Sequence, residues 1–395
     1  MKVAHDLDGG AEERALDNEK PVLITGGAGF IGTNVADRFL QKGQRVILYD
    51  NLSRPGVERN IEWLRETHGD LVQLDQSDIR DAAAIKRAVK GCSRVFHFAA
   101  QVAVTASLTD PFFDFEVNAR GTLNLLEAIR GLETPPPLIF TSSNKVYGEM
   151  DDVEIRRGDA RYEPAEAEIR KYGFSERRPL QFHSPYGCSK GAAGQYVLDY
   201  ARTFGLPAVV FHMSCIYGPH QFGNEDQGWV AHFLIRALES GQITLYGDGR
   251  QVRDVLFVED LVDAFLLTHE NIARLSGQSF NMGGGPDNTI SLLELLDLIE
   301  EVNGSKPPVN FEDWRSADQR YYVSDIRKFS AATGWKPRLK VEDGIGRLYR
   351  WLIEDRAGAS RLEKALNSRT SKNDAKQRRS KRHWRQNGRH ELVVN

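Results

Sequence analysis

Short apolar, β-branched runs alternate with amphipathic stretches from residue 21 onward, and no other feature of the sequence restricts the fold as much. Such alternation is typical of βαβ units, whose strands form a parallel sheet between layers of helices. The predicted strands are residues 22–25, 45–49, 71–74, 94–98, 138–141 and 208–212. The predicted helices are residues 30–42, 57–67, 81–90, 111–130 and 185–204. We therefore predict an α/β fold with a doubly wound parallel sheet.

The domain organisation follows from changes in composition along the 395 residues. Residues 1–20 are predicted to be an N-terminal extension that lacks the apolar stretch of a secretory signal. Residues 21–212 carry the regular alternation, and residues 213–355 carry the less regular pattern of a smaller α/β lobe. Residues 356–395 hold 12 Lys and Arg against three acids, which is typical of a disordered tail. The insertion at 148–180 has the length of a lid or a disordered loop.

Composition excludes several classes of protein. Apolar residues make up 41% of the chain and charged residues 27%, as in globular proteins that bury a core. The longest apolar runs have the length of strands, so we expect no membrane span. Cys92, Cys188 and Cys215 are too few and too scattered for a disulfide framework or a metal site. We expect a cytoplasmic protein that holds no metal, with nucleic acid as a partner only if the basic tail binds it.

A glycine-rich segment, Thr-Gly-Gly-Ala-Gly-Phe-Ile-Gly at 25–32, joins the first predicted strand to the first predicted helix. Glycines in this place let the backbone turn tightly and approach a pyrophosphate, whose charge meets the positive end of the helix. A glycine-rich turn without a ligand is the alternative, but the position between a strand and a helix favours nucleotide binding. The predicted contacts are Gly26, Gly29, Phe30, Ile31 and Gly32.

Asp50 ends the second predicted strand, 24 residues after Gly26. A carboxylate there accepts hydrogen bonds from both ribose hydroxyls and repels a 2′-phosphate, so NAD is predicted rather than NADP. Arg54 can partly offset that repulsion, and Asn51 lies beside the same ribose position. Asp78 and Ile79 follow the third predicted strand as adenine contacts, with a helix N-cap as the competing interpretation of Asp78.

Tyr186 and Lys190 are four residues apart at the start of a predicted helix, so their side chains share one face. An ammonium group beside a tyrosine, together with the positive nicotinamide ring of NAD, favours the phenolate and lowers the tyrosine pKa, as a general base requires. Ser143, at the end of the fifth predicted strand, is expected to share the substrate hydroxyl with Tyr186. Asn118 is expected to hold a water next to Lys190, unless it is only a polar residue inside a helix.

Taken in order, these motifs resemble the extended short-chain dehydrogenase/reductase family over residues 20–355. The resemblance also rests on Phe-Ala-Ala at 98–100, Tyr-Gly at 147–148 and Gly-Asp-Gly-Arg-Gln-Val-Arg-Asp at 247–254. It implies a Rossmann fold, NAD as the cofactor, a nucleotide-sugar substrate, and Tyr186 as acid/base with Ser143 and Lys190 as its partners. The cofactor contacts that it adds are Ala99, Ala100, Gln101, Asn118, Tyr186 and Lys190. The implied substrate contacts are Ser143, Asn144, Lys145, His183, Gln227 and, on the pyrophosphate, Arg253 and Arg315.

Within this family, segments 142–148, 182–191 and 221–230 resemble the branch that inverts carbon 2 of a CDP-linked sugar, from CDP-paratose to CDP-tyvelose. The 4,6-dehydratases of the family place an Asp-Glu pair directly after the Ser/Thr, to eliminate water. Asn144 and Lys145 stand there and cannot replace that pair, so removal and return of a hydride on opposite faces of the sugar is the predicted reaction.

Several alternatives remain at this point. An epimerase acting at carbon 4 is not excluded by residue chemistry, a dehydratase or decarboxylase is disfavoured by Asn144 and Lys145, and a non-catalytic nucleotide sensor is disfavoured by Tyr186 and Lys190. His212 and Cys215 stand where many relatives have Arg and Asn, which leaves the phosphate contacts of that stretch open. We expect a homo-oligomer, either a dimer or a tetramer.

Overall fold

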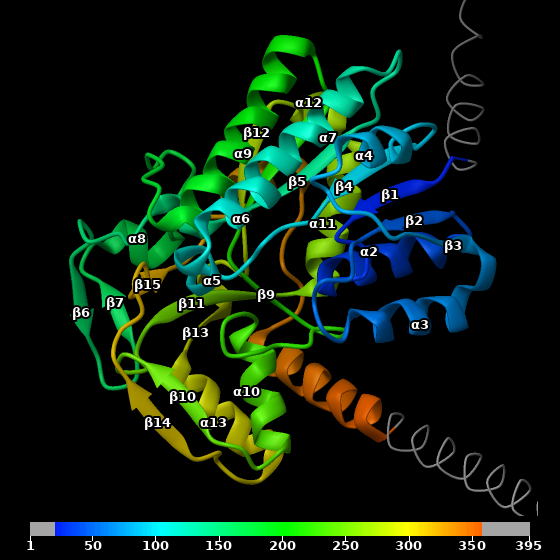
Figure 1. Ribbon diagram of the computed structural model, residues 1–395. Helices are drawn as coiled ribbons and strands as arrows, with labels where there is room; N and C mark the ends of the chain where they lie inside the picture. Colours follow the sequence, from blue (N-terminus) through cyan, green and yellow to red (C-terminus); the bar gives the residue numbers. More distant parts are fainter. Residues whose placement is uncertain (1–19, 358–395) are drawn as a thin grey trace, which may run out of the picture. The chain divides into compact units, whose positions relative to one another are not determined.

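The computed structural model describes residues 20–357 (Figure 1). The predicted extension at 1–20 and tail at 356–395 therefore lie, apart from their inner ends, outside the described residues. The chain divides into two units, the first ending at Leu348. The described residues of the second unit, 349–357, are helical. All features discussed below belong to the first unit.

A seven-stranded sheet with the order β12-β8-β5-β4-β1-β2-β3 forms the centre of this unit. Every pair of neighbouring strands is parallel, as in the pairing of β1 with β2 that begins at Val22 and Val46. The strands are β1 (Val22–Thr25), β2 (Val46–Tyr49), β3 (Val72–Asp75), β4 (Arg94–His97), β5 (Leu138–Ser143), β8 (Ala208–Met213) and β12 (Gln278–Met282). The predicted doubly wound parallel sheet is confirmed.

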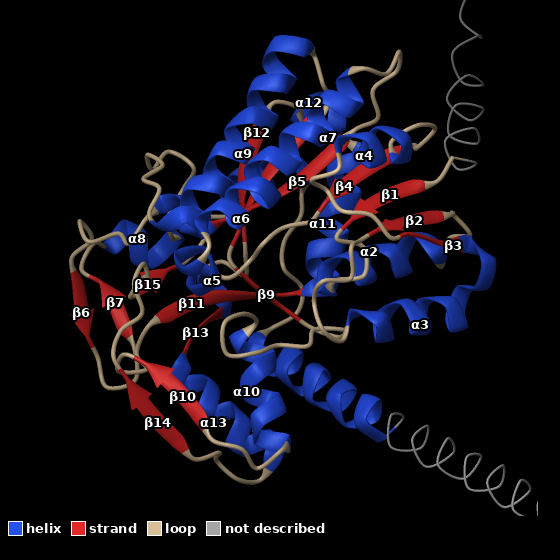
Figure 2. Ribbon diagram, viewed as in Figure 1, coloured by secondary structure: helices blue, strands red, loops and turns tan. Residues whose placement is uncertain are grey.

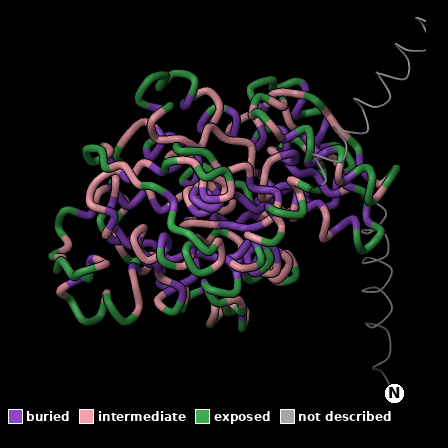
Figure 3. The backbone as a smooth tube through the Cα atoms, turned by 90° about the horizontal axis from the view of Figure 1, so that it is seen from below, coloured by how far each residue is buried: buried purple, intermediate pink, exposed green. Residues whose placement is uncertain are grey.

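Helices cover both faces of this sheet, as Figure 2 shows. Val22 and Ile24 of β1 pack into one apolar core with α2, α3 and α11, whereas Leu23 packs into another with α4, α7 and α9. This follows from the pleat of a strand, which sends alternate side chains to opposite faces. Figure 3 shows the buried segments in the interior of the fold and the exposed ones mainly in outer loops. The helices are α2 (Phe30–Leu40), α3 (Val57–His68), α4 (Ala82–Ala88), α5 (Val104–Thr109), α6 (Pro111–Phe115), α7 (Gly121–Arg130), α8 (Ala167–Tyr172), α9 (Ser184–Phe204), α10 (Trp229–Leu238), α11 (Val258–Glu270), α12 (Ile272–Leu275), α13 (Leu292–Asn303) and α14 (Arg327–Thr333).

Smaller sheets are formed mostly by the second half of the chain. Strand β11 pairs with β9, β13 and β15, strand β10 pairs with β14, and β6 and β7 form a hairpin. Strand β12, from the stretch assigned to the smaller lobe, returns to the large sheet beside β8. The strands are β6 (Ile155–Arg157), β7 (Tyr162–Pro164), β9 (Cys215–Tyr217), β10 (Ile243–Tyr246), β11 (Val252–Phe257), β13 (Thr289–Ser291), β14 (Val309–Glu312) and β15 (Tyr321–Tyr322).

Two predicted segments differ in detail from the structure. The helix expected over 111–130 is helical throughout but contains a π-helical turn at Glu116–Arg120, between α6 and α7. Such turns widen a helix locally and are frequent at functional sites. The insertion at 148–180 is ordered into the β6–β7 hairpin and α8. Within residues 20–357, no helix is both long enough and apolar enough to cross a lipid bilayer.

Candidate active site

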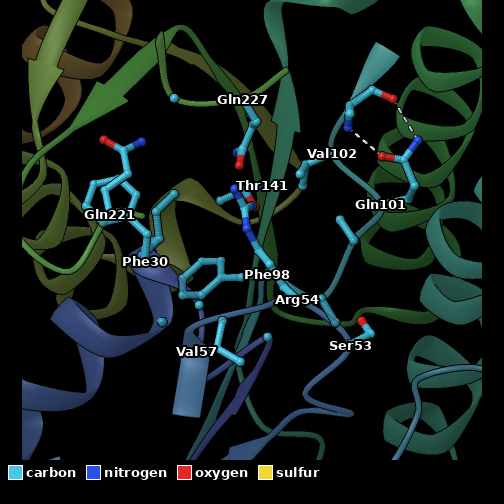
Figure 4. A pocket seen from close by; sticks show the side chains of 18 of the residues that line it. Phe30, Ser53, Arg54, Val57, Phe98, Gln101, Val102, Thr141, Gln221 and Gln227 are labelled. Atoms are coloured by element: carbon cyan, nitrogen blue, oxygen red, sulfur yellow. Dashed lines mark hydrogen bonds between the residues drawn. The ribbon is translucent and has the colours of Figure 1, made fainter. Parts of the chain in front are cut away.

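A cavity of about 600 Å³ opens at the carboxyl ends of β1, β2, β4 and β5 (Figure 4). In a doubly wound sheet this edge is where ligands bind, because loops from both faces diverge there. The cavity brings together nearly all of the predicted cofactor contacts. Those that line it are Gly26, Gly29, Phe30, Ile31, Gly32, Asp50, Asn51, Arg54, Asp78, Ile79, Ala99, Ala100, Gln101, Tyr186 and Lys190.

The glycine segment leaves no room for larger residues. Gly26 has φ +68°, and a Cβ there would lie 2.7 Å from the backbone nitrogen of Ala99. A Cβ at Gly32 would lie 2.4 Å from the carbonyl oxygen of Gly26. Gly29 is the N-cap of α2 and offers no side-chain hydrogen bond, so the first amides of the helix point toward the cavity without a cap. This cradle of backbone donors fits the pyrophosphate of NAD.

Asp50 follows β2 and is held by backbone amides. Its Oδ2 accepts a hydrogen bond from Ala28 N at 3.1 Å and its Oδ1 accepts one from Leu52 N at 2.9 Å. Burial raises the pKa of this carboxyl group, while the two amide hydrogen bonds lower it. Each oxygen keeps a second lone pair, so the carboxylate still fits two ribose hydroxyls.

The neighbours of Asp50 are arranged around the adenine side of the cavity. Asn51 Nδ2 donates to Asp78 Oδ2 at 2.8 Å, and Arg80 pairs with the same carboxylate, which lowers the pKa of Asp78. The carboxylate of Asp78 is thus engaged in this loop, and Ile79 behind it is buried. Arg54 extends into the cavity, and burial lowers the pKa of its guanidinium group (Figure 4).

Tyr186, Ser143 and Lys190 all line the inner part of the cavity. Burial raises the pKa of Tyr186 to about 12, although a hydrogen bond with Ser143 lowers it. Burial lowers the pKa of Lys190 to about 7, while the charge of Asp114 raises it. Burial is therefore the largest influence on the pKa of Tyr186 in the chain without a cofactor, and a positively charged nicotinamide ring beside it would favour the phenolate.

Asn118 lies in the π-helical turn and is fully engaged with protein groups. Its Oδ1 accepts from Gln101 N at 2.9 Å, and its Nδ2 lies within 3.1 Å of Gln101 O, Asp114 Oδ1 and Ser189 Oγ. It does not line the cavity in the described part of the chain. Its amide therefore ties the loop after β4 to α6 and α9, and the water-holding role predicted for it stays a prediction.

Asn144 and Lys145 turn away from the cavity and contact a segment far along the chain. Asn144 Nδ2 donates to Gln319 Oε1 at 3.1 Å, and Lys145 Nζ donates to Ala317 O at 3.1 Å. Lys145 Nζ also lies 3.3 Å from Asp318 Oδ1. Arg253 Nη2 donates to that same oxygen at 2.7 Å. We name Lys145, Arg253 and Asp318 the cation cluster.

Arg253 of the cation cluster is buried, Lys145 and Asp318 are partly buried, and the three charges are coupled. Burial lowers the pKa of Lys145, and the charge of Asp318 raises it. Burial alone would raise the pKa of Asp318, but the charges of Lys145 and Arg253 hold it below its usual value. Two cations share one carboxylate, so the cluster carries an excess positive charge that suits a phosphate group.

The remaining predicted substrate contacts are more scattered. Gln227 lines the cavity (Figure 4). The Arg315 guanidinium stacks 3.8 Å from the Tyr246 ring centroid and lies 3.4 Å from Asp226 Oδ1. The side chain of His183 is half exposed, with Nδ1 3.4 Å from Glu149 Oε1. Neither arginine nor His183 lines the cavity among residues 20–357.

Cys215 and His212, the two departures noted in the sequence, have different surroundings. Cys215 lines the cavity, and its Sγ accepts a hydrogen bond from Trp229 Nε1 at 3.3 Å. Burial raises the pKa of its thiol, so the group is a neutral packing partner. His212 is buried beneath Tyr147, and burial lowers its pKa to about 4, so it carries no charge that would hold a phosphate at neutral pH.

Sequence reasoning missed Asp114, Asp318 and Gln319. Asp114 is buried among Gln101, Asn118 and Lys190, whereas Asp318 and Gln319 meet the residues after β5 across more than 170 positions. Only Asp114 had a local signal, since it lies four residues before Asn118 on the same predicted helix.

Comparisons with known proteins agree with this geometry. Residues 22–283 match the model of the NAD dependent epimerase/dehydratase family. The chain belongs to this family. It is 41% identical over 337 residues to CDP-paratose 2-epimerase of Salmonella typhi, which covers 84% of this chain and 98% of that protein.

Solved structures resemble the chain over a similar length. UDP-glucose 4-epimerase of Thermus thermophilus, in complex with NAD, superposes with a TM-score of 0.70 at 31% identity, covering 84% of this chain and 98% of that one. UDP-glucose 4-epimerase of Thermotoga maritima, with UDP-glucose, gives a TM-score of 0.70 at 30% identity, covering 85% and 99%. The predictions of the family, of an enzyme and of NAD as its cofactor are confirmed.

Proposed function

We propose that this chain is an isomerase that inverts carbon 2 of a nucleotide sugar, converting CDP-paratose to CDP-tyvelose. The observation that carries the proposal is the pairing of Asn144 with Gln319 and of Lys145 with Asp318, directly after Ser143. The 4,6-dehydratases use a carboxylate pair as acid and base at this place, and an amide and an ammonium group tied to Asp318 cannot replace that pair. The identity with CDP-paratose 2-epimerase supports the choice of carbon 2 and of CDP.

The glycine segment and Asp50 would hold NAD, which supplies a hydride acceptor and donor when it is bound. Tyr186 would remove the proton of the carbon-2 hydroxyl and later return it to the oxygen of the inverted carbon. Ser143, which is hydrogen-bonded to Tyr186, would also hydrogen-bond the oxygen on carbon 2 of the substrate. The Lys190 ammonium would stabilise the Tyr186 phenolate. No net oxidation occurs, because the keto sugar is reduced again before it leaves.

Inversion requires that the sugar turn between the two halves of the reaction while the nucleotide stays in place. We assign binding of the nucleotide diphosphate to the lobe at 213–355, where Arg253 and Arg315 offer guanidinium groups. We assign binding of NAD to residues 21–212. Both arginines are already paired with carboxylates, Arg253 with Asp318 and Arg315 with Asp226. The diphosphate would therefore join or replace an existing ion pair.

The test of the reaction uses the purified full chain with CDP-, UDP-, GDP- and dTDP-linked sugars. NMR of the product identifies which carbon has been inverted. Inversion at carbon 2 of CDP-paratose supports the proposal, whereas inversion of UDP-glucose at carbon 4 would favour the activity of the two structural relatives named above.

The fate of hydrogen at carbon 2 tests the mechanism separately. A hydride that leaves carbon 2 and returns to it never exchanges with water. Substrate deuterated at carbon 2 should therefore keep its label in ordinary water, and unlabelled substrate should gain none in deuterium oxide. Solvent deuterium at carbon 2 of the product would instead require proton abstraction from carbon.

We also propose a cytoplasmic homo-oligomer. Helices α6 and α9 contact each other and expose Phe112, Phe115 and Tyr196, with 83%, 54% and 46% of their surface accessible. Exposed aromatic residues on adjacent helices are typical of a surface that a second copy covers. Sedimentation of the full chain should give a dimer or tetramer, and Phe112→Lys should shift it toward the monomer.

A further inference from the structure

Asp114 is a buried carboxylate on a helix whose other side chains face outward. Helix α6 spans Pro111–Phe115, and its residue Phe112 is 83% exposed, whereas Asp114 has no exposed surface. Burying a carboxylate is costly unless its charge is compensated. The surroundings of Asp114 must therefore explain why the helix turns this residue inward.

Only one oxygen of Asp114 is engaged in hydrogen bonds. Oδ1 accepts from Gln101 Nε2 at 3.0 Å and from Asn118 Nδ2 at 3.1 Å. Oδ2 is equally buried but has no hydrogen-bond partner among the described residues. Two amide groups are fixed by the carboxylate, and part of its charge remains available to groups nearby.

The titratable groups that face this carboxylate come from two other elements. Lys190 and Tyr186 project from α9, and Lys190 Nζ lies 4.5 Å from the centre of the Phe140 ring. His97 on β4 is near Lys190 but is buried between Thr25 and Thr122, and burial lowers its pKa to about 3. The Ser189 hydroxyl is the remaining polar neighbour. Among these groups, Lys190 is therefore the one that can carry a positive charge beside the carboxylate of Asp114 near neutral pH.

We propose that Asp114 is a positioning residue for proton transfer at Tyr186: its carboxylate keeps Lys190 in the ammonium form and fixes Gln101 and Asn118 beside it. The proposal deepens the proposed function and rests on it for the reaction, but the state of Lys190 can be measured without any substrate.

The direction of the effect follows from the charges. Burial lowers the pKa of Lys190 to about 7, and Asp114 is the group that raises it. Asp114 also raises the pKa of Tyr186, after the larger effect of burial. Removal of the carboxylate charge therefore lowers both pKa values. Activity should then decrease at alkaline pH, where Lys190 loses its proton, and increase at acid pH, where Tyr186 is more readily deprotonated. A role confined to packing would change the height of a pH profile and leave its position unchanged.

The test compares Asp114→Asn with Asp114→Glu and Asp110→Asn in the full chain. Asp114→Asn keeps the shape and removes the charge, and Asp114→Glu keeps the charge. Asp110→Asn is the matched control, because it removes an exposed charge at the start of the same helix and an asparagine still caps it. Lysines labelled with ¹³C at Cε are titrated by NMR, and the signal of Lys190 is assigned by its loss in Lys190→Arg.

We expect Asp114→Asn to lower the pKa of Lys190 by at least about one unit and to move the kcat profile to lower pH by a similar amount. Asp114→Glu and Asp110→Asn should leave both near their wild-type positions. An unchanged Lys190 titration in Asp114→Asn would overturn the proposal. A shifted titration in a protein that inverts no sugar would instead count against the proposed function alone.

If Asp114→Asn does not fold, the proposal can still be tested by titrating Asp114 itself in a variant of Lys190. Burial raises the pKa of Asp114, while a hydrogen bond with Ser189 and the charge of Lys190 lower it. The ¹³Cγ titration of Asp114 should therefore move to still higher pH in Lys190→Met. An Asp114 titration that is the same with and without Lys190 would also overturn the proposal.

Discussion

The two halves of the candidate site bind charge in different ways. The cofactor half offers a negatively charged diphosphate mainly backbone amides, at Gly29 and the start of α2, together with one carboxylate, Asp50, for the ribose. The substrate half, as proposed above, comprises the cation cluster, in which Lys145 and Arg253 are already paired with Asp318. Both halves fit a diphosphate, but only the second has to rearrange its own ion pairs to accept one.

The difference has a physical cause. Amide dipoles at a helix start need no counter-ion, so a site made of them is complete before the ligand arrives. Buried cations are stable only when paired, so a site made of them holds a carboxylate until the ligand takes its place. The first arrangement suits a cofactor that stays bound, and the second suits a substrate that must leave after each turnover.

The largest expected effect concerns Tyr186, which lies where the two halves meet. Tyr186→Phe removes only the hydroxyl that moves the proton, so turnover should fall by about 10²–10⁴-fold while NAD and substrate still bind. Stopped-flow kinetics and calorimetry measure the two separately. Tyr196→Phe, on the exposed side of the same helix, is the control. Loss of NAD binding in Tyr186→Phe would mean that the hydroxyl is part of the cofactor half.

The next effect tests the cation cluster. Arg253→Met should raise KM for the nucleotide sugar by about 10–100-fold, because a charge-assisted contact with the diphosphate is lost, and should leave NAD affinity unchanged. It should also lower the free energy of unfolding, since Asp318 loses one of its two cations. Arg250→Met is the matched control, because Arg250 pairs with Asp248 outside the cluster. An unchanged KM would remove Arg253 from the substrate half.

A substitution of Asp50 tests the cofactor half, and it should give the opposite pattern to Arg253→Met. Asp50→Asn should weaken NAD binding by about tenfold and reduce the preference for NAD over NADP, because the ionic acceptor and the repulsion of a 2′-phosphate disappear together. KM for the nucleotide sugar should stay the same. Isothermal calorimetry with both cofactors checks this, with Asp75→Asn as the control on the neighbouring strand. A rise in sugar KM similar to that of Arg253→Met would contradict the division into two halves.

The smallest expected effect is on stability. Burial lowers the pKa of Lys190 to about 7, so between that pH and the ordinary lysine pKa of about 10.4 the unfolded chain binds more protons than the folded one. The free energy of unfolding should therefore rise with pH across this window, and Lys190→Met should remove that part of the slope. The variant should also melt at a lower temperature at pH 7, since the buried carboxylate of Asp114 loses the cation that it faces. Melting curves from pH 6 to 9 test both points, and identical slopes would mean that Lys190 is not desolvated.

Most of the cofactor half was predictable because its signals are local. The glycine segment, Asp50 and the Tyr186/Lys190 pair are each defined by a few residues around a strand end or along one helix turn. The α/β fold followed from the alternation of strands and helices for the same reason. Less was predictable about the segment at 111–130, because a π-helical turn leaves the apolar pattern of a helix almost unchanged.

The amino-acid sequence by itself predicted the parallel sheet, the nucleotide cradle and the acid/base candidates, since the signals for them are local: the alternation of strand and helix patterns, the glycine segment, and the spacing of Tyr186 and Lys190. Only the tertiary structure decided that Lys145 and Arg253 share Asp318, that Asn144 contacts Gln319, and that β12 returns to the large sheet. Those contacts join residues 65 to 175 positions apart. They depend on which segments pack against each other in the folded chain, and the spacing of residues within one segment does not determine that.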